Sequence, residues 1–219
     1  MPIAPRCTRI TTLLAAITVA GCSSAARSAS DAPTPQSAGS PLSPAAVVTA
    51  DRGIPPYTDA DVHFMSGMIP HHAQAVLIAG WAASHGARDD VRILCERIVV
   101  AQRDEIATMR RWLSERGEAV PAADATHMTM TMNGMQHDML MPGMLTAEQL
   151  AELDRARGAA FDELFLTSMI RHHRGALTMV DELFASPGAA NDDTIFKFAS
   201  DVFADQTTEI DRMEQMLGR

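Results

Sequence analysis

Apolar residues recur every three or four positions along most of the chain after about residue 57, the spacing that places them on one face of an α-helix. The pattern predicts four long helices, at about 58–84, 89–117, 159–185 and 192–217. Glycine or a Ser-Pro-Gly break follows each of the first three, as is usual at helix C-termini. A shorter helix is predicted at 146–157, where Thr146 and Gln149 have the spacing of a capping box. Thr58 and Asp61 have the same spacing with a shorter acid.

The first and third long helices carry nearly the same sequence. Their shared positions are Asp61, Phe64, Met68, Ile69, His71, His72 and Ala75 in the first, and Asp162, Phe165, Met169, Ile170, His172, His173 and Ala176 in the third. The second and fourth helices agree in the segments QRDEIATM (102–109) and QTTEIDRM (206–213). A helix pair written twice, at about 58–117 and 159–217, predicts an all-α fold, an antiparallel four-helix bundle.

The repeated histidines are predicted to face the interior of this bundle. At 100° per residue, His71 and His72 fall within the same arc as Met68 and the apolar positions around it. The partner helices direct amide and carboxylate side chains inward as well, namely Gln102, Glu105, Gln206 and Glu209. Burying such groups is unfavourable unless they pair or bind a ligand. Pro70 removes a helix hydrogen bond just before the histidines, so a bend in the first helix is expected.

Methionine beside histidine is ligand chemistry suited to soft metal ions. A thioether is a neutral, soft donor that selects Cu(I) or Ag(I), and imidazole binds copper and zinc. Histidines three and four residues after a methionine share its helical face. The predicted ligands in the bundle are Met68, His71, His72, Met169, His172 and His173. The alternative is that these histidines are core residues hydrogen-bonded to carboxylates, namely Asp61, Glu105, Asp162 and Glu209.

Residues 118–145 form a methionine-rich segment that is predicted to be an irregular loop. The part from His127 to Met144 holds seven methionines and two histidines in eighteen residues. Methionine normally fills cores, but a polar segment with Gly and Pro cannot bury all these sulfurs on one helix face. We therefore predict a second set of copper ligands: His127, Met128, Met130, Met132, Met135, His137, Met139, Met141 and Met144. The alternative is a linker that faces a membrane or is merely prone to oxidation.

The first residues have the features of an export signal. Two arginines precede an apolar segment that is too short to span a membrane, which predicts a signal peptide at 1–21. The ending Val-Ala-Gly-Cys resembles the lipobox of bacterial lipoproteins and predicts acylation of Cys22. A simple cleaved signal is the alternative. Residues 22–56, rich in Ser, Ala and Pro, are predicted to be a disordered tether, and residues 57–219 to be the bundle domain.

Composition and charge narrow the choice of partner. The 219-residue chain is 47% apolar but only 5% aromatic, which favours helix over sheet. Its formal charge of -9 argues against binding nucleic acid, which requires a clustered basic surface. With Cys22 acylated, Cys95 has no disulfide partner in the mature chain and is predicted to be a packed thiol.

The two M-I-x-H-H-x-x-A segments, the two Q-x-x-E-I-x-x-M segments and the spacing between them resemble domain-of-unknown-function family 305. That family has ferritin-like helical members, which include CopM-like copper-binding proteins of the bacterial envelope. The resemblance covers about residues 58–217, and Pro70 belongs to a form of the motif associated with the family. It implies extracytoplasmic copper handling by the residues at matching positions, which are Met68, His71, His72, Met169, His172 and His173.

Three classes of function are compatible with these residues. The favoured class is a non-enzymatic lipoprotein, anchored on the extracytoplasmic side of the cell membrane, that binds Cu(I) or Ag(I) for sequestration or for transfer to another envelope protein. The second is a ferritin-like di-iron oxidoreductase, although the Glu-x-x-His spacing of such sites is missing from the chain. Its ligands would be Asp61, Glu105, Asp162, Glu209, His72 and His173. The third is a bundle with a structural polar core that binds a protein partner.

Overall fold

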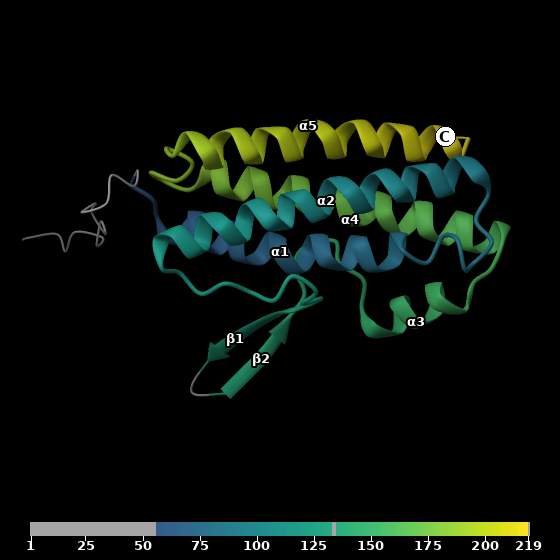
Figure 1. Ribbon diagram of the computed structural model, residues 1–219, viewed down its shortest axis with the longest axis horizontal. Coiled ribbons are helices and arrows are strands. Elements are labelled where there is room, and N and C mark those ends of the chain that lie inside the picture. Colours follow the sequence, from purple (N-terminus) through teal and green to yellow (C-terminus); the bar gives the residue numbers. More distant parts are fainter. Residues whose placement is uncertain (1–55, 133–134, 219) are drawn as a thin grey trace, which may run out of the picture. The chain divides into compact units, whose positions relative to one another are not determined.

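The structure is a computed structural model that describes residues 56–132 and 135–218. The predicted signal peptide, Cys22 and almost all of the predicted tether lie outside the described residues, as do the side chains of residues 129–137. Helices and two short strands follow one another along the described chain (Figure 1). They are α1 (Asp59–Ala79), α2 (Asp89–Arg116), β1 (Met128–Met132), β2 (Met135–Met139), α3 (Ala147–Arg155), α4 (Ala159–Ala185) and α5 (Asp193–Met216).

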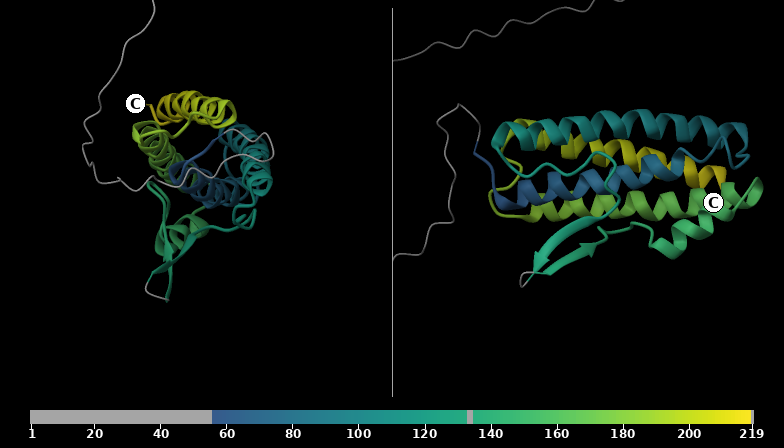
Figure 2. Two further views of the ribbon diagram at one scale, coloured as in Figure 1. Left: turned by 90° about the vertical axis from the view of Figure 1, so that its left-hand side faces the viewer. Right: turned by 60° about the horizontal axis from the view of Figure 1, so that its bottom comes forward.

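The four long helices form the predicted bundle. α1 packs against α2, α4 packs against α5, and α1 contacts α4, to which it runs antiparallel (Figure 1). α2 and α5 close the remaining side of the bundle less tightly (Figure 2). Because α1 has neighbours on several sides, its buried residues lie nearly all round the helix instead of along one stripe. The all-α antiparallel bundle predicted from the doubled helix pair is confirmed.

The helix ends follow the local sequence. α1 and α3 both begin with the expected capping boxes, made by Thr58 with Asp61 and by Thr146 with Gln149. Gly117 ends α2 at φ 74°, a left-handed conformation that glycine adopts without strain. α1 ends at Ala79, earlier than the predicted residue 84, and the residues that follow form turns. Pro70 lies within α1, and the helix continues through it without interruption.

The methionine-rich segment contains two strands, β1 and β2, where an irregular loop was predicted, whereas residues 118–127 and 140–145 have no helix or strand. β1 and β2 pair as an antiparallel hairpin, with Met128 opposite Met139. The run Met-Thr-Met-Thr-Met alternates with a period of two, and β-branched threonine favours a strand. The strands are separated in the sequence by Asn-Gly, the dipeptide preferred in two-residue hairpin turns. The sequence therefore contained a hairpin signal that a search for helical periodicity overlooks.

Two apolar clusters fill the bundle, one toward each end. The first uses the start of α1, the end of α2, the end of α4 and the start of α5, and includes Phe64, Met68, Trp112, Leu183 and Phe198. The second uses the opposite halves of the same helices and includes Ile78, Leu94, Phe161, Phe165 and Met169. Buried polar side chains separate the two clusters on all four helices, namely His71, His72, Gln102, His172, His173 and Gln206. A polar layer therefore crosses the middle of an apolar core.

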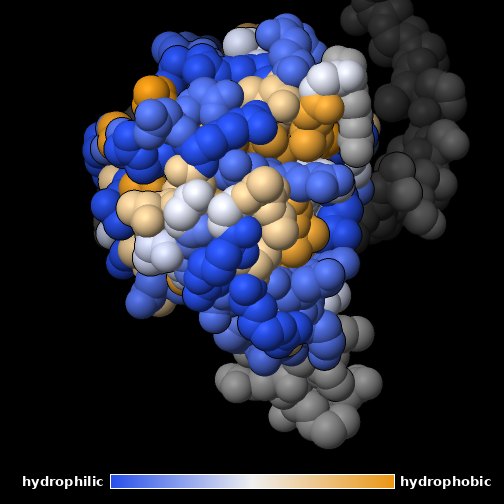
Figure 3. Space-filling view, turned by 90° about the vertical axis from the view of Figure 1, so that its right-hand side faces the viewer, coloured by the Kyte–Doolittle hydropathy of each residue, from blue (hydrophilic) through white to orange (hydrophobic). Residues whose placement is uncertain are grey.

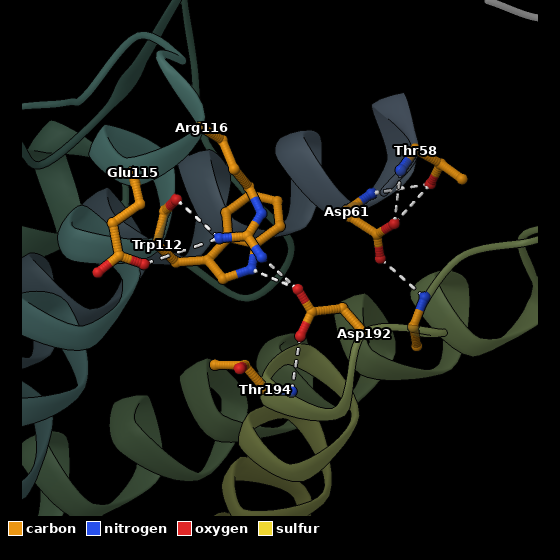
Figure 4. Close-up of polar contacts among 8 residues, drawn as sticks. Thr58, Asp61, Trp112, Glu115, Arg116, Asp192 and Thr194 are labelled. Carbon is orange, nitrogen blue, oxygen red and sulfur yellow. Dashed lines mark hydrogen bonds and ion pairs between the residues drawn. The ribbon is translucent and has the colours of Figure 1, made fainter. Parts of the chain in front are cut away.

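Each repeat holds the helix connection of the other repeat. Asp61, near the start of α1, accepts a hydrogen bond of 2.7 Å from the backbone N–H of Ala190 in the α4–α5 connection (Figure 4). Asp162, near the start of α4, accepts a 3.3 Å bond from the backbone N–H of Arg88 in the α1–α2 connection. Both aspartates are buried, so these bonds fix where the second helix of each pair begins.

A buried cluster joins the end of α2 to the start of α5 (Figure 4). Asp192 caps α5 and accepts bonds from the indole N–H of Trp112, at 3.2 Å, and from the Arg116 guanidinium. That guanidinium also lies 4.0 Å from the centroid of the Trp112 ring. Because both partners of the ion pair are buried and hydrogen-bonded, the cluster fixes the end of the bundle at which α1 and α5 begin.

The surface has the character of an ordinary globular domain. At the end of the bundle where α5 finishes, it is mostly hydrophilic with small apolar areas (Figure 3). A few large apolar side chains, among them Val100 and Phe196, are exposed, as on most folded proteins. Within residues 56–132 and 135–218, no helix is long and apolar enough to cross a membrane.

Candidate metal centre

Four histidines from two helices meet in the middle of the bundle. His71 and His72 belong to α1, His172 and His173 belong to α4, and all four are fully buried. The ring centroids of His71 and His172 are 3.8 Å apart, with planes inclined by 40°. Within each sequence pair the centroids are 6.2 and 6.3 Å apart, at 53° and 55°. The two pairs therefore have nearly the same internal geometry, and the contact between His71 and His172 brings them into one histidine layer.

A glutamate from the partner helix contacts one histidine of each pair. Nε2 of His72 lies 2.7 Å from Oε2 of Glu105 on α2, and Nε2 of His173 lies 2.7 Å from Oε2 of Glu209 on α5. The second contact is an aligned hydrogen bond, whereas the first is a close ion-pair contact with poorer alignment. Each glutamate side chain is about one-fifth exposed, at 21% and 20%, so it connects the buried layer with the solvent.

The remaining ring nitrogens are largely without partners. His71 donates from Nε2 to the backbone carbonyl of Pro142 at 3.0 Å. Neither nitrogen of His172 has a hydrogen-bond partner among the described residues, and Nδ1 of the other three histidines also has none there. Unpaired buried polar atoms are rare in native proteins because desolvating them is unfavourable. These nitrogens are the atoms that a bound ligand would satisfy.

Burial keeps the imidazoles of His71 and His172 uncharged. Burial, together with the nearby His72, lowers the pKa of His71 to about 3. Burial, followed by the effect of His71, likewise holds the pKa of His172 well below its usual value. Desolvation dominates because the interior cannot solvate a cationic ring as water does. Neutral imidazole is the form that binds metal ions, so His71 and His172 need no deprotonation near neutral pH.

A buried methionine lies one helical turn before each histidine pair. Met68 precedes the α1 histidines by one helical turn and packs in the first apolar cluster, and Met169 takes the matching place in the second. Both are fully buried. Across the described part of the chain, no three His, Cys, Asp or Glu side chains are grouped as a metal site would require. Neutral nitrogen donors beside thioethers suit a soft monovalent ion better than a hard divalent one.

The predicted ligands of the methionine-rich segment are divided between two places. His127 is half exposed, with Nε2 3.5 Å from Oδ1 of Asp138, and Met139 is also exposed. Met128 packs against the first apolar cluster, whereas Met141 and Met144 are buried within it. The side chains of the other predicted ligands lie outside the described residues; these are Met130, Met132, Met135 and His137. The structure thus separates the hairpin residues from two methionines of the core.

A family model described as "Domain of unknown function (DUF305)" matches residues 61–217, which is most of the chain. The chain belongs to the DUF305 family. The match begins at the first repeated aspartate and ends with the last long helix, so it includes both helix pairs and the segment between them. The family resemblance inferred from the doubled histidine motif is therefore confirmed.

Solved structures of similar fold include other DUF305 proteins. One from Streptomyces coelicolor, described as secreted, is 26% identical with a TM-score of 0.60, over 73% of this chain and 92% of that one. A fragment from Deinococcus radiodurans is 29% identical with a TM-score of 0.60, over 75% and 99%. CopM in its Cu(I)-bound form is 25% identical with a TM-score of 0.54, over 71% and 94%. CopM structures with Cu(II) and with Ag are also similar.

An uncharacterized protein of Acanthamoeba polyphaga mimivirus matches a shorter part of this DUF305 chain. It is 32% identical over 56 residues, which are 26% of this chain. The match spans only 37% of that relative. It therefore concerns a fraction of the fold and carries no argument about the whole protein.

In this DUF305 protein, the chain after the hairpin is docked onto the histidine helices. The Gln74 side-chain amide makes two hydrogen bonds with the backbone of Leu145. It donates to the carbonyl at 3.0 Å and accepts from the N–H at 2.7 Å. Gly175 lies under Pro142, and a Cβ there would be 1.9 Å from the Pro142 carbonyl oxygen. The repeated motif did not predict a role for these residues. The sequence does show that Gln74 and Gly175 occupy equivalent positions in the two repeats and differ there, which could have indicated a local role.

The two repeated aspartates are not part of the histidine layer. Asp61 and Asp162 bind backbone N–H groups at the ends of the bundle, as described above. Of the four carboxylates expected to bond the histidines in a structural core network, Glu105 and Glu209 contact histidines and the two aspartates do not. A di-iron centre needs all four carboxylates near the histidines. The observed arrangement, with the missing Glu-x-x-His spacing, does not fit that chemistry.

Cys95 has the packed environment that its sequence position predicted. It is buried in the second apolar cluster, and its repeat counterpart Ala199 is buried in the first. Burial raises the pKa of the Cys95 thiol to about 12. A thiol held in this form is a poor ligand, because metal ions bind the thiolate.

Proposed function

We propose that this DUF305 protein binds Cu(I), and Ag(I) as its chemical analogue, to sequester the ion or pass it to another protein of the cell envelope. The protein acts as a binder and not as an enzyme. The observation behind this proposal is the fully buried layer of four histidines whose Nδ1 atoms have no hydrogen-bond partner in the described structure. Nδ1 atoms of these histidines would hold the ion, with the sulfurs of Met68 and Met169 as the flanking donors.

The glutamates support this assignment through the histidine tautomers. An imidazole that donates its Nε2 proton to a carboxylate presents the lone pair of Nδ1 to a metal ion. Glu209 holds His173 in this way, and Oε2 of Glu105 lies 2.7 Å from Nε2 of His72. Their charges also compensate a monovalent cation in an interior where an unpaired charge is unfavourable. All the proposed donor atoms are neutral, which favours Cu(I) over Zn(II).

The comparisons support the same ligand class. CopM, a structural neighbour, has been solved with Cu(I), Cu(II) and Ag. On the hairpin, Met139 is an exposed thioether, and half-exposed His127 lies just before β1. We infer that the hairpin is a second, more accessible binding region, from which ions exchange faster than from the buried layer.

The test is an anaerobic titration with Cu(I) against a competing chelator, followed by metal counting. The background should lack the hairpin, so that only the buried layer is measured. His72→Ala/His173→Ala should lose the tight ion, while His63→Ala, an exposed histidine on α1, should bind as the parent does. Retention of tight Cu(I) by the double variant would show that the histidines are structural. Equal affinity of the parent for Zn(II) would contradict the assignment to a soft ion.

We infer that the protein is held at the extracytoplasmic face of the cell membrane by acylation of Cys22. The supports are the lipobox-like sequence and a structural neighbour described as secreted. Expressed with its signal, the wild type should partition into detergent, whereas Cys22→Ala should remain in the aqueous phase. Aqueous partitioning of a mature wild-type chain would contradict the lipid anchor and leave the copper proposal intact.

A further inference from the structure

A cleft between α2 and α5 is lined by the two glutamates that contact the histidine layer. Its volume is about 170 Å³, and its lining includes Gln102, Glu105, Asp205, Gln206 and Glu209. Glu105 and Glu209 are the residues that contact His72 and His173 from within the layer. The same side chains therefore line the cleft and touch the buried rings.

Two buried amides in the cleft have unused hydrogen-bonding atoms. Gln102 and Gln206 are each only 3% exposed, and they occupy equivalent positions in the two repeats. Within the described residues, Oε1 of Gln102 and both amide atoms of Gln206 have no hydrogen-bond partner. A buried amide is unfavourable without a partner, so these atoms are suited to a transient polar occupant.

The charge of the cleft favours a cation. Glu105, Glu209 and Asp205 all contribute to its lining, against Arg97 as the basic side chain there. Burial, followed by the charges of Glu105 and Glu209, raises the pKa of Asp205 above its usual value, as expected where carboxylates are crowded. A cleft lined by one sign of charge concentrates the opposite ion and speeds its association.

A larger opening beside α1 has a different character. A groove of about 830 Å³ lies between α1, α2 and the chain that follows α2. Its basic lining residues are Arg103 and Arg110, with Asp124 as the acidic one, and apolar side chains make up most of the rest. Electrostatics therefore favours cation passage at the α2–α5 cleft over this groove.

We propose that the α2–α5 cleft is the entry port through which Cu(I) or Ag(I) reaches the buried histidines. The carboxylates attract the ion, the amide oxygens of Gln102 and Gln206 replace part of its hydration, and Glu105 and Glu209 pass it to the rings they contact. This inference rests on the proposed function. It adds a route by which the ion enters the site. Changes in this route should alter the rate of ion uptake without altering the affinity of the site.

The test places a positive charge in the port without touching any proposed ligand. Ala101 is exposed and lines the cleft, so Ala101→Lys should slow the transfer of Cu(I) from a chromophoric chelator by about tenfold in stopped-flow measurements. Thr208→Lys, on α5 across the cleft, should slow it similarly. The matched control is Ala107→Lys, an exposed alanine of the same helix that lines the groove between α1 and α2.

The outcomes separate the port from the copper site itself. The port predicts slower uptake in the two cleft variants, unchanged final stoichiometry, and a difference that shrinks as salt is added. Equal uptake rates in Ala101→Lys, Thr208→Lys and Ala107→Lys would overturn the port while leaving copper binding in place. Slowing in Ala107→Lys alone would overturn it in favour of the other groove. A wild type that takes up no Cu(I) would overturn the proposed function and the port with it.

Discussion

His71 shows how the bundle maintains a neutral imidazole at its centre. It is fully buried and its Nε2 proton is donated to the Pro142 carbonyl. Its pKa is about 3, against 6.5 for a solvated histidine, chiefly because of burial. As the pH falls below about 6.5, His71 becomes protonated in the unfolded chain but stays neutral in the folded protein. Stability that is complete above that pH is therefore lost progressively as the pH falls toward 3.

This difference predicts a pH dependence of the metal-free protein. Between pH 7 and pH 5, His71 alone should lower the free energy of unfolding by about 2 kcal/mol, since each pH unit between the two pKa values contributes about 1.4 kcal/mol. His71→Gln keeps a donor for the Pro142 carbonyl and should reduce the fall by this amount in urea unfolding. For His63→Gln, at an exposed position of the same helix, the free energy of unfolding should fall with pH as it does for the wild type. Parallel pH curves for all three proteins would contradict the neutral histidine.

For single residues, the sequence predicts whether a side chain faces the core better than it predicts which residue that side chain contacts. The helical wheel places His71, His72 and their repeat equivalents inward because their spacing from Met68 is local information. It cannot show that Asp61 binds Ala190 or that Pro142 accepts from His71, because those contacts join segments far apart in the sequence. The buried ring nitrogens without partners also become visible only once the packing is known.

The hairpin and the segment after it are different elements with different roles. β1 and β2 pair with each other, whereas Met141 and Met144 belong to the core. Replacing residues 129–139 with a Gly/Ser linker should therefore lower the number of bound Cu(I) ions and leave the Tm within a few degrees of wild type. Extending the replacement to residue 145 should lower the Tm clearly, because it removes the buried methionines and the partners of His71 and Gln74.

These two deletions are measured by thermal unfolding and metal counting on the same preparations. An unchanged Cu(I) count in the shorter deletion would show that the hairpin methionines are not ligands. A similar loss of Tm in both deletions would show that the hairpin itself stabilises the bundle.

The docked segment also depends on one close approach between elements. Gly175 of α4 leaves no room for a Cβ, which would lie 1.9 Å from the Pro142 carbonyl oxygen. Gly175→Ala should thus lower the free energy of unfolding by about 1–3 kcal/mol, despite alanine's better helix propensity. Gly80→Ala is the matched control, because Gly80 ends α1 with φ −60°, which alanine adopts readily. Equal stability of the two variants in urea unfolding would contradict the docking.

Elements differ in how far local sequence specifies them. The long helices are predictable because their apolar period and their caps are written within each segment, as at Thr58 and Gly117. The early end of α1 and the docking of residues 141–145 depend on neighbours from other parts of the chain. The alternation of methionine and threonine in residues 128–132 is a strand pattern from which β1 could have been predicted. This period of two is not visible in the helical periodicity on which the loop prediction rested.

On the scale of the whole molecule, the duplication explains why the histidine motif is written twice. Each repeat supplies one pair of histidines, and the two pairs meet in a single layer where the ring centroids of His71 and His172 are 3.8 Å apart. The aspartate at the start of each repeat then holds the helix connection of the other, so that neither repeat is complete alone. The bundle therefore has one shared polar centre between two apolar halves.

The central claim is that this shared layer is a binding site for a soft monovalent ion. Anomalous diffraction from crystals loaded anaerobically with Cu(I) locates the ion without reference to any variant. The account predicts an anomalous peak between α1 and α4, within bonding distance of histidine nitrogens from both repeats. Peaks confined to the hairpin, with no anomalous density among the four buried histidines in a fully loaded crystal, would contradict it.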